Sequence, residues 1–108
     1  MIILIDRSNS ISIFENETDA ENCLETIDII EGEYEFMDEY GQIYKTDIIS
    51  TPKFFSTGSF KLIFTGKYDK EKLLSIIERA KEIFPVTKKF KNLKELKEYI
   101  SKTIDITK

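Results

Sequence analysis

The spacing of the apolar residues changes several times within this 108-residue chain, between strand-like alternation and helical periodicity. Five segments have the β-branched runs or the alternation that predict strands: 1–5, 11–14, 32–36, 42–49 and 54–64. A polar turn joins the first two segments, and a turn that ends at Gly41 joins the next two. We therefore expect an antiparallel sheet of four or five strands.

Three further segments have the spacing of amphipathic helices. A capping box begins at Thr18 and predicts a helix of about ten residues. Asp69 is expected to cap the helix with the longest apolar stripe, over about 70–84, and a last helix is expected over about 92–103. This order of elements predicts a single α+β domain over residues 1–108, with about three helices packed on one face of the sheet.

The residue types that most often carry catalysis are scarce. The chain has no histidine and a single cysteine, Cys23, which excludes Ser–His and Cys–His nucleophiles and zinc sites built from these residues. Neither a glycine-rich phosphate loop nor a calcium-binding loop is visible. We therefore expect a protein that is not an enzyme, with no catalytic residues, no cofactor and no metal site. Cys23 lies on the apolar side of the expected first helix, which predicts that its thiol is buried.

Cysteine content and hydropathy also bear on where the protein acts. One cysteine cannot form an intramolecular disulfide, which fits a reducing compartment. No apolar run is long enough to cross a bilayer, and no secretory signal pattern is visible. The expected location is the cytoplasm, without a membrane partner.

Charges are sorted by sign along the chain. Residues 1–50 contain thirteen acids and two bases, for a net charge of −11, whereas residues 51–108 contain fourteen bases and seven acids, for a net charge of +7. Like charges that are crowded on one surface destabilise the folded state, so fold stability does not explain this separation. It indicates a binding surface for a partner of opposite charge.

The residues expected to bind this partner lie between the first helix and the central turn. They are Glu21, Glu25, Asp28, Glu31, Glu33, Glu35, Asp38, Glu39 and Tyr40. Glu21 and Glu25 repel each other across one helical turn, and Glu31, Glu33 and Glu35 are expected to repel each other on one strand face. Tyr40 is expected to be an exposed aromatic anchor at the turn. A solvated acidic face without a partner is the alternative interpretation.

The second half of the chain offers a competing interpretation. Five lysines precede or begin the last helix: Lys88, Lys89, Lys91, Lys94 and Lys97. Such a stripe is able to contact a phosphate backbone. However, the sequence pI of about 4.9 and the near absence of arginine argue against a nucleic-acid partner. Two alternatives therefore stay open: a nucleic-acid-associated regulator that uses the 88–97 segment, and a structural subunit whose oppositely charged halves pair in a homo-oligomer.

Residues 11–49 also resemble a known group of proteins. The segment contains Ile-Ser-Ile-Phe, an acidic capped helix with Leu24-Glu25-x-Ile27-Asp28-Ile29, and then Gly32-Glu33-Tyr34-x-x-x-Asp38-x-x-Gly41. This order resembles small acidic bacterial immunity proteins that are encoded beside polymorphic or contact-dependent toxins. The resemblance covers about a third of the chain and brings no site residues of known role. It implies a non-catalytic inhibitor that occludes the active site of a cognate basic toxin domain, such as a nuclease.

Overall fold

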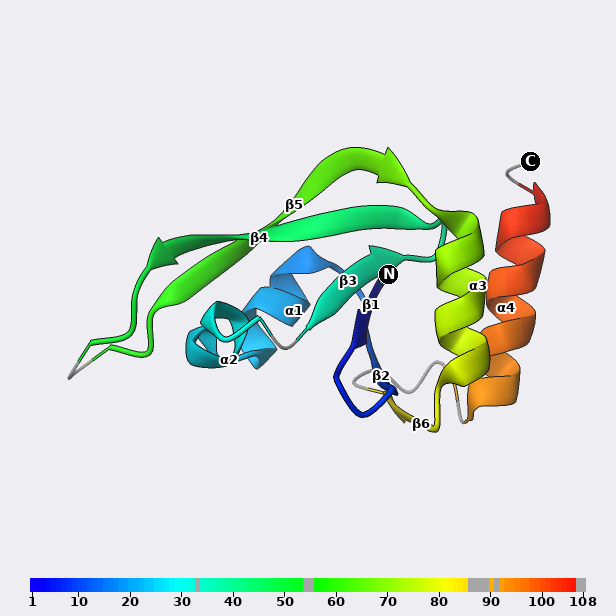
Figure 1. Ribbon diagram of the computed structural model, residues 1–108, viewed down its shortest axis with the longest axis horizontal. Helices are drawn as coiled ribbons and strands as arrows, with labels where there is room; N and C mark the ends of the chain where they lie inside the picture. The colour runs from blue at the N-terminus through cyan, green and yellow to red at the C-terminus, as the bar shows by residue number, and fades with distance from the viewer. Residues whose placement is uncertain (33, 54–55, 86–89, 91, 107–108) are drawn as a thin grey trace.

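The chain folds into a six-stranded sheet with helices on both of its faces (Figure 1). The structure is a computed structural model, and it describes residues 1–32, 34–53, 56–85, 90 and 92–106. The strands in this described part are β1 (Ile2–Ile5), β2 (Ser10–Phe14), β3 (Glu35–Asp38), β4 (Gln42–Ser50), β5 (Ser59–Tyr68) and β6 (Glu82–Pro85). The helices are α1 (Glu17–Cys23), α2 (Thr26–Ile30), α3 (Lys70–Arg79) and α4 (Leu93–Ile106).

The expected N-terminal hairpin is confirmed and lies at the centre of the sheet, whose strand order is β5-β4-β3-β1-β2-β6. Asp6 shapes its turn, because the Oδ1 atom of Asp6 accepts hydrogen bonds from the backbone N–H groups of Ser8 and Ser10, at 2.9 and 3.1 Å. Asn9 completes the turn with a φ of 63°, a left-handed conformation that asparagine tolerates better than most residues. The hydrogen bonds of this turn lower the pKa of Asp6, although burial acts in the opposite direction.

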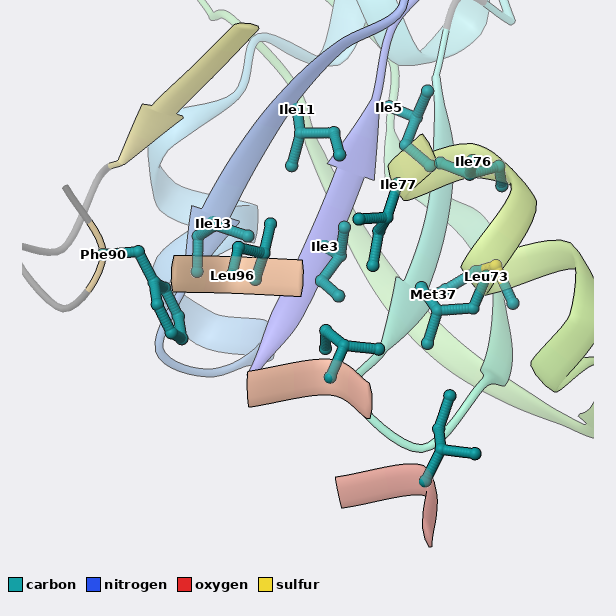
Figure 2. Packing of buried hydrophobic residues seen from close by; sticks show 12 residues of the cluster. Ile3, Ile5, Ile11, Ile13, Met37, Leu73, Ile76, Ile77, Phe90 and Leu96 are labelled. Atoms are coloured by element: carbon teal, nitrogen blue, oxygen red, sulfur yellow. The ribbon is translucent and has the colours of Figure 1, made fainter. Parts of the chain in front are cut away.

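The α+β class is confirmed, but helices cover both faces of the sheet rather than the one face expected. All four residues of β1 are buried, so other elements must pack against both of its faces. One core lies under α3 and α4 and is shown in Figure 2: Ile3, Ile5, Ile11, Ile13, Met37, Leu73, Ile76, Ile77, Phe90, Leu96, Ile100 and Ile104. The other core lies under α1 and α2: Ile2, Leu4, Phe14, Ala20, Ile29, Phe36, Phe60 and Leu62.

The sheet is mixed rather than antiparallel, because the helix expected over 70–84 ends earlier. Asp69 caps α3 as expected, with its Oδ1 atom 2.9 Å from the backbone nitrogen of Lys72. The helix ends at Arg79, and residues 82–85 form β6, which pairs in parallel with β2. The residue before a proline disfavours helical backbone, which explains why the segment that ends at Pro85 is extended. Pro85 also suits an edge strand, where a missing N–H group costs little.

The first expected helix is instead two short helices, α1 and α2. Asn16, not Thr18, is the N-cap of α1, and its Oδ1 atom accepts a hydrogen bond from the backbone N–H of Asp19 at 2.8 Å. Leu24 has extended backbone and ends α1, after which Glu25 is the N-cap of α2. This break turns Cys23 outward, so the expectation that its thiol is buried is wrong.

The strands β4 and β5 form a long hairpin, here called the arm, which includes the described residues between them. In Figure 1 the arm extends from the top of α3 past α1 and α2, along the 46 Å long axis of the molecule. The two strands pair from Gln42 and Tyr68 to Ser50 and Ser59. Residues 54 and 55 of the expected strand 54–64 lie outside the described residues, and β5 continues four residues beyond its expected end, to Tyr68.

Candidate partner-binding surface

Seven acids and no base occupy residues 15–31, the acidic segment that contains α1 and α2. Local chemistry explains why this sequence is helical despite its charge. Glu17 and Asp19 lie in the first turn of α1, where carboxylates interact favourably with the positive end of the helix dipole. The side chain of Asn16 satisfies one backbone N–H group of that turn. The buried residue Ala20 then faces the sheet. The acids of α1 are therefore compatible with a short helix that is held by packing.

The short helix α2 exposes two isoleucines in the middle of this acidic segment. Ile29 is buried against the sheet, whereas Ile27 and Ile30 are 44% and 46% exposed. They are three residues apart, so they share one side of the helix. Glu25 and Glu31 are exposed at the two ends of α2, and Asp28 is half-buried beside them. We call these five residues the α2 patch: Glu25, Ile27, Asp28, Ile30 and Glu31.

No ion pair reaches the three acids of the α2 patch from any residue that the structure describes. Their charges are therefore not neutralised within the described chain, and they surround apolar surface. Exposed apolar side chains within a polar rim are a feature of many protein-binding sites. The structure thus brings together three of the residues that the sequence predicted for binding: Glu25, Asp28 and Glu31.

Glu21, another of the expected binding residues, serves a structural contact instead. Its Oε2 atom accepts a hydrogen bond from the backbone N–H of Leu62 at 2.7 Å, and its Oε1 atom lies 3.4 Å from Lys61 Nζ. Only 8% of the side chain is exposed. The carboxylate therefore attaches α1 to the edge strand β5. A polar groove of about 380 Å³ lies at this junction, between the helices and residues 57–61 near the loop end of the arm, and Cys23 lines it.

The expected row of Glu31, Glu33 and Glu35 on one strand face does not form. Glu31 is the C-cap of α2, and β3 begins only at Glu35. Glu33 lies outside the described residues. Glu35 is on the face of β3 that is turned toward α3, where its Oε1 atom lies 3.4 Å from Lys72 Nζ. Glu35 is thus on the opposite side of the sheet from the acids of α1 and is already paired.

Asp38 and Glu39 are buried, contrary to the expectation that they bind a partner at the surface. The Oδ1 atom of Asp38 accepts hydrogen bonds from the backbone N–H groups of Tyr40 and Gln42, both at 2.9 Å. Burial raises the pKa of Asp38 above its ordinary value of 3.8, and these two hydrogen bonds oppose the rise. Glu39 accepts a hydrogen bond from the Tyr99 hydroxyl at 3.1 Å, which joins the turn to α4.

Tyr40 is exposed at the β3–β4 turn, as expected, but at the other end of β3 from α2. The turn itself has the expected form, with Gly41 at a φ of 85°. Asp38 therefore holds the turn together, and Glu39 joins the turn to α4. Tyr40 is not part of the α2 patch.

Three aromatic residues on the arm form an exposed surface that the sequence patterns did not predict. The ring centroid of Phe64 lies 5.9 Å from that of Tyr44 and 5.5 Å from that of Tyr68. Phe64 is 40% exposed and Tyr68 is 59% exposed. The Tyr44 hydroxyl donates a hydrogen bond to Glu17 Oε1 at 3.2 Å, which places this aromatic row beside the acidic segment. Burial, together with the charges of Asp38 and Glu17, raises the pKa of Tyr44 to about 12.

The lysine-rich segment that favoured a nucleic-acid partner is only partly described. Lys88, Lys89 and Lys91 lie outside the described residues, whereas Lys94 and Lys97 are exposed on α4. The Nζ atom of Lys97 lies 3.9 Å from Glu78 Oε1. Helix α4 contains three bases and three acids, and α3 contains three bases and two acids. The helical layer opposite the acidic segment is therefore nearly balanced in charge rather than basic.

The burial of Asp38 predicts a pH-dependent stability difference for two substitutions. Because the pKa of Asp38 is raised in the folded state, folding disfavours its charged carboxylate. This cost to stability is present at pH values above the folded-state pKa and disappears below the ordinary value of 3.8, where the carboxyl group is protonated in both states. Asp38→Asn keeps the acceptor oxygen and is expected to be more stable than the original protein at pH 7, but not at pH 3.5. Asp38→Ala leaves two N–H groups without an acceptor and should cost about 1–3 kcal/mol. Urea unfolding at both pH values measures this, and an Asn variant less stable at pH 7 would contradict the account.

In the described residues, no metal site or membrane-spanning helix adds to the assignment of this surface, and neither does a known relative. Among the described residues, no group of three or more His, Cys, Asp and Glu side chains is placed to hold a metal ion. None of the helices in the described part has the length and apolar character needed to cross a membrane. Comparison of the chain with protein-family models, with curated proteins and with solved structures found no match.

Proposed function

We propose that this chain is a non-catalytic binding protein, an immunity protein that neutralises a basic toxin domain by covering its active site with the α2 patch. The observation that carries the proposal is the pair of exposed isoleucines within a segment of seven acids and no base. The resemblance of residues 11–49 to small acidic immunity proteins supports the same class. A nuclease is a suitable toxin, because its active site binds the phosphate backbone through basic side chains.

The two kinds of residue in the α2 patch would contribute to binding at different stages. Unpaired acids attract a basic partner over distance and raise the association rate. The isoleucines contribute only after contact, when their exposed surface is removed from water. Burying a fully exposed isoleucine releases about 1.5–3 kcal/mol, so two half-exposed ones would together release about that amount. The aromatic row offers a second apolar contact, since it meets the acidic segment at the hydrogen bond from Tyr44 to Glu17.

The proposal predicts that the protein rescues growth when it is co-expressed with the toxin domain encoded beside its gene. The two purified proteins should also form a complex that withstands gel filtration at micromolar concentration. Absence of both rescue and complex would contradict the proposal.

A mixed-sequence DNA or RNA oligonucleotide tests the alternative partner, and we expect negligible binding of this protein to it at physiological salt. Oligonucleotide binding that is lost in a Lys94→Ala, Lys97→Ala variant would instead favour a nucleic-acid-associated regulator.

A further inference from the structure

A cleft of about 400 Å³ opens between the β1–β2 turn, the start of β3 and the helix α3. It is lined by both arginines of the chain, Arg7 from the turn and Arg79 from the end of α3. Lys72 and Ile76 line it from the same side of α3 as Arg79, because the spacings of four and three residues place all three side chains on one helix face. The buried residues Ile5 and Ile76 provide the apolar part of the lining, beside these three bases and the acids Asp6 and Glu35.

The two described acids that line the cleft already have partners, whereas neither arginine pairs with a carboxylate among the described residues. Asp6 accepts hydrogen bonds from two backbone N–H groups and from the Ser8 hydroxyl within its own turn. Glu35 is paired with Lys72. Arg7 has no hydrogen bond or ion pair with any side chain or backbone group in the described part of the chain. Within the described residues, Arg79 makes one hydrogen bond, from its Nε atom to the carbonyl oxygen of Ser75 at 3.4 Å.

We propose that this cleft binds a small organic phosphate, a phosphomonoester carried on a planar ring. Two guanidinium groups without carboxylate partners in the described part of the chain match a doubly charged phosphate, which each is able to bind through paired N–H donors. The ring would lie against Ile5, Ile76 and Tyr34, which also lines the cleft. A volume of about 400 Å³ is within the range that accommodates a ligand of this size. The cleft shares no residue with the α2 patch, so this site is independent of the toxin-binding proposal.

Calorimetric titration of the full chain with adenosine 5′-monophosphate, adenosine and inorganic phosphate tests the proposal. The nucleotide is expected to bind at low salt with a dissociation constant below about 1 mM. Adenosine, which lacks the phosphate, should not bind measurably, and inorganic phosphate should bind about tenfold or more weakly, because it lacks the ring. No nucleotide binding, or equal affinity for nucleotide and inorganic phosphate, would overturn the proposal.

Three double variants separate the cleft from the general charge of the surface. Arg7→Ala with Arg79→Ala should weaken nucleotide binding about tenfold or more, and the corresponding lysine pair should recover only part of it, because lysine cannot bind bidentately. Lys94→Ala with Lys97→Ala removes the same charge from α4 and should leave the affinity unchanged. All these positions are exposed, so an unchanged melting temperature is the check on folding. If the Arg7→Ala, Arg79→Ala variant and the Lys94→Ala, Lys97→Ala variant lost the same nucleotide affinity, the phosphate would be bound by bulk charge and not by the cleft.

Discussion

Reversing Glu25, Asp28 and Glu31 to lysine is expected to slow association with the basic partner about 10–100-fold at low salt. These acids have no ion-pair partner in the described structure, so their charges act on whatever approaches α2. The loss should shrink as salt rises, because the Debye length falls from about 30 Å at 0.01 M to about 8 Å at 0.15 M. Stopped-flow or surface-binding kinetics at several salt concentrations measure the effect.

The matched control for this reversal is a second triple variant with the same charge change on the other side of the sheet. Glu71, Glu78 and Glu98 are exposed acids of α3 and α4, and all three are changed to lysine. The overall charge of the two variants is then identical, so a difference in association rate reports the position of the charges. Equal slowing in both would mean that net charge alone guides the partner, and the α2 patch would lose its support. Both variants should unfold within about 1 kcal/mol of the original protein.

Replacing Ile27 and Ile30 by alanine should leave association nearly unchanged but speed dissociation of the complex about 10–100-fold. The exposed parts of the two side chains account for about 1.5–3 kcal/mol of apolar burial on docking, and each 1.4 kcal/mol is a factor of ten. Such short-range contacts form after encounter, so their loss affects the dissociation rate. The stability of the free protein should change by no more than about 1 kcal/mol, since the side chains are already half-exposed.

Ile63→Ala with Leu74→Ala is the control for apolar burial away from the α2 patch. Both residues are 38% exposed and lie on β5 and α3, so the variant removes a comparable apolar surface. It should leave the dissociation rate unchanged. If the Ile27→Ala, Ile30→Ala variant dissociated no faster than the Ile63→Ala, Leu74→Ala control, the contact surface would lie elsewhere. Substitutions in the aromatic row of Tyr44, Phe64 and Tyr68 would then be the next test.

The sequence determined the local elements and the fold class, because these depend on neighbours a few residues apart. The N-terminal hairpin, the cap at Asp69, the turn at Gly41 and the last helix all follow from turn chemistry, capping and periodicity. What the local pattern did not show is how far each element extends. The apolar periodicity past Arg79 continues to residue 84, yet the chain leaves the helix there, because Ile83 pairs with Ile11 of β2. That pairing depends on a strand some seventy positions earlier in the chain.

The coverage of the sheet also depends on tertiary geometry. The seven residues of α1 extend about 10 Å, whereas the ten residues of β5 extend about 33 Å. One short helix cannot cover such a strand, which leaves Phe64 and Tyr68 exposed while Phe60 and Leu62, on the same strand, are buried. Strand alternation alone assigns Phe60, Leu62 and Phe64 to one face and cannot distinguish the buried from the exposed.

For the binding surface, the sequence determined where negative charge is concentrated, and the tertiary structure decided which of these charges are free. Glu21, Glu35 and Glu39 are paired with Leu62, Lys72 and Tyr99, which lie 41, 37 and 60 positions away in the sequence. Glu25, Asp28 and Glu31 have no ion-pair partner among the described residues, so they keep their charge available. Like-charge patterns are local and visible in a sequence. The neutralising partner of a carboxylate is supplied by packing between distant segments, and only the folded chain shows it.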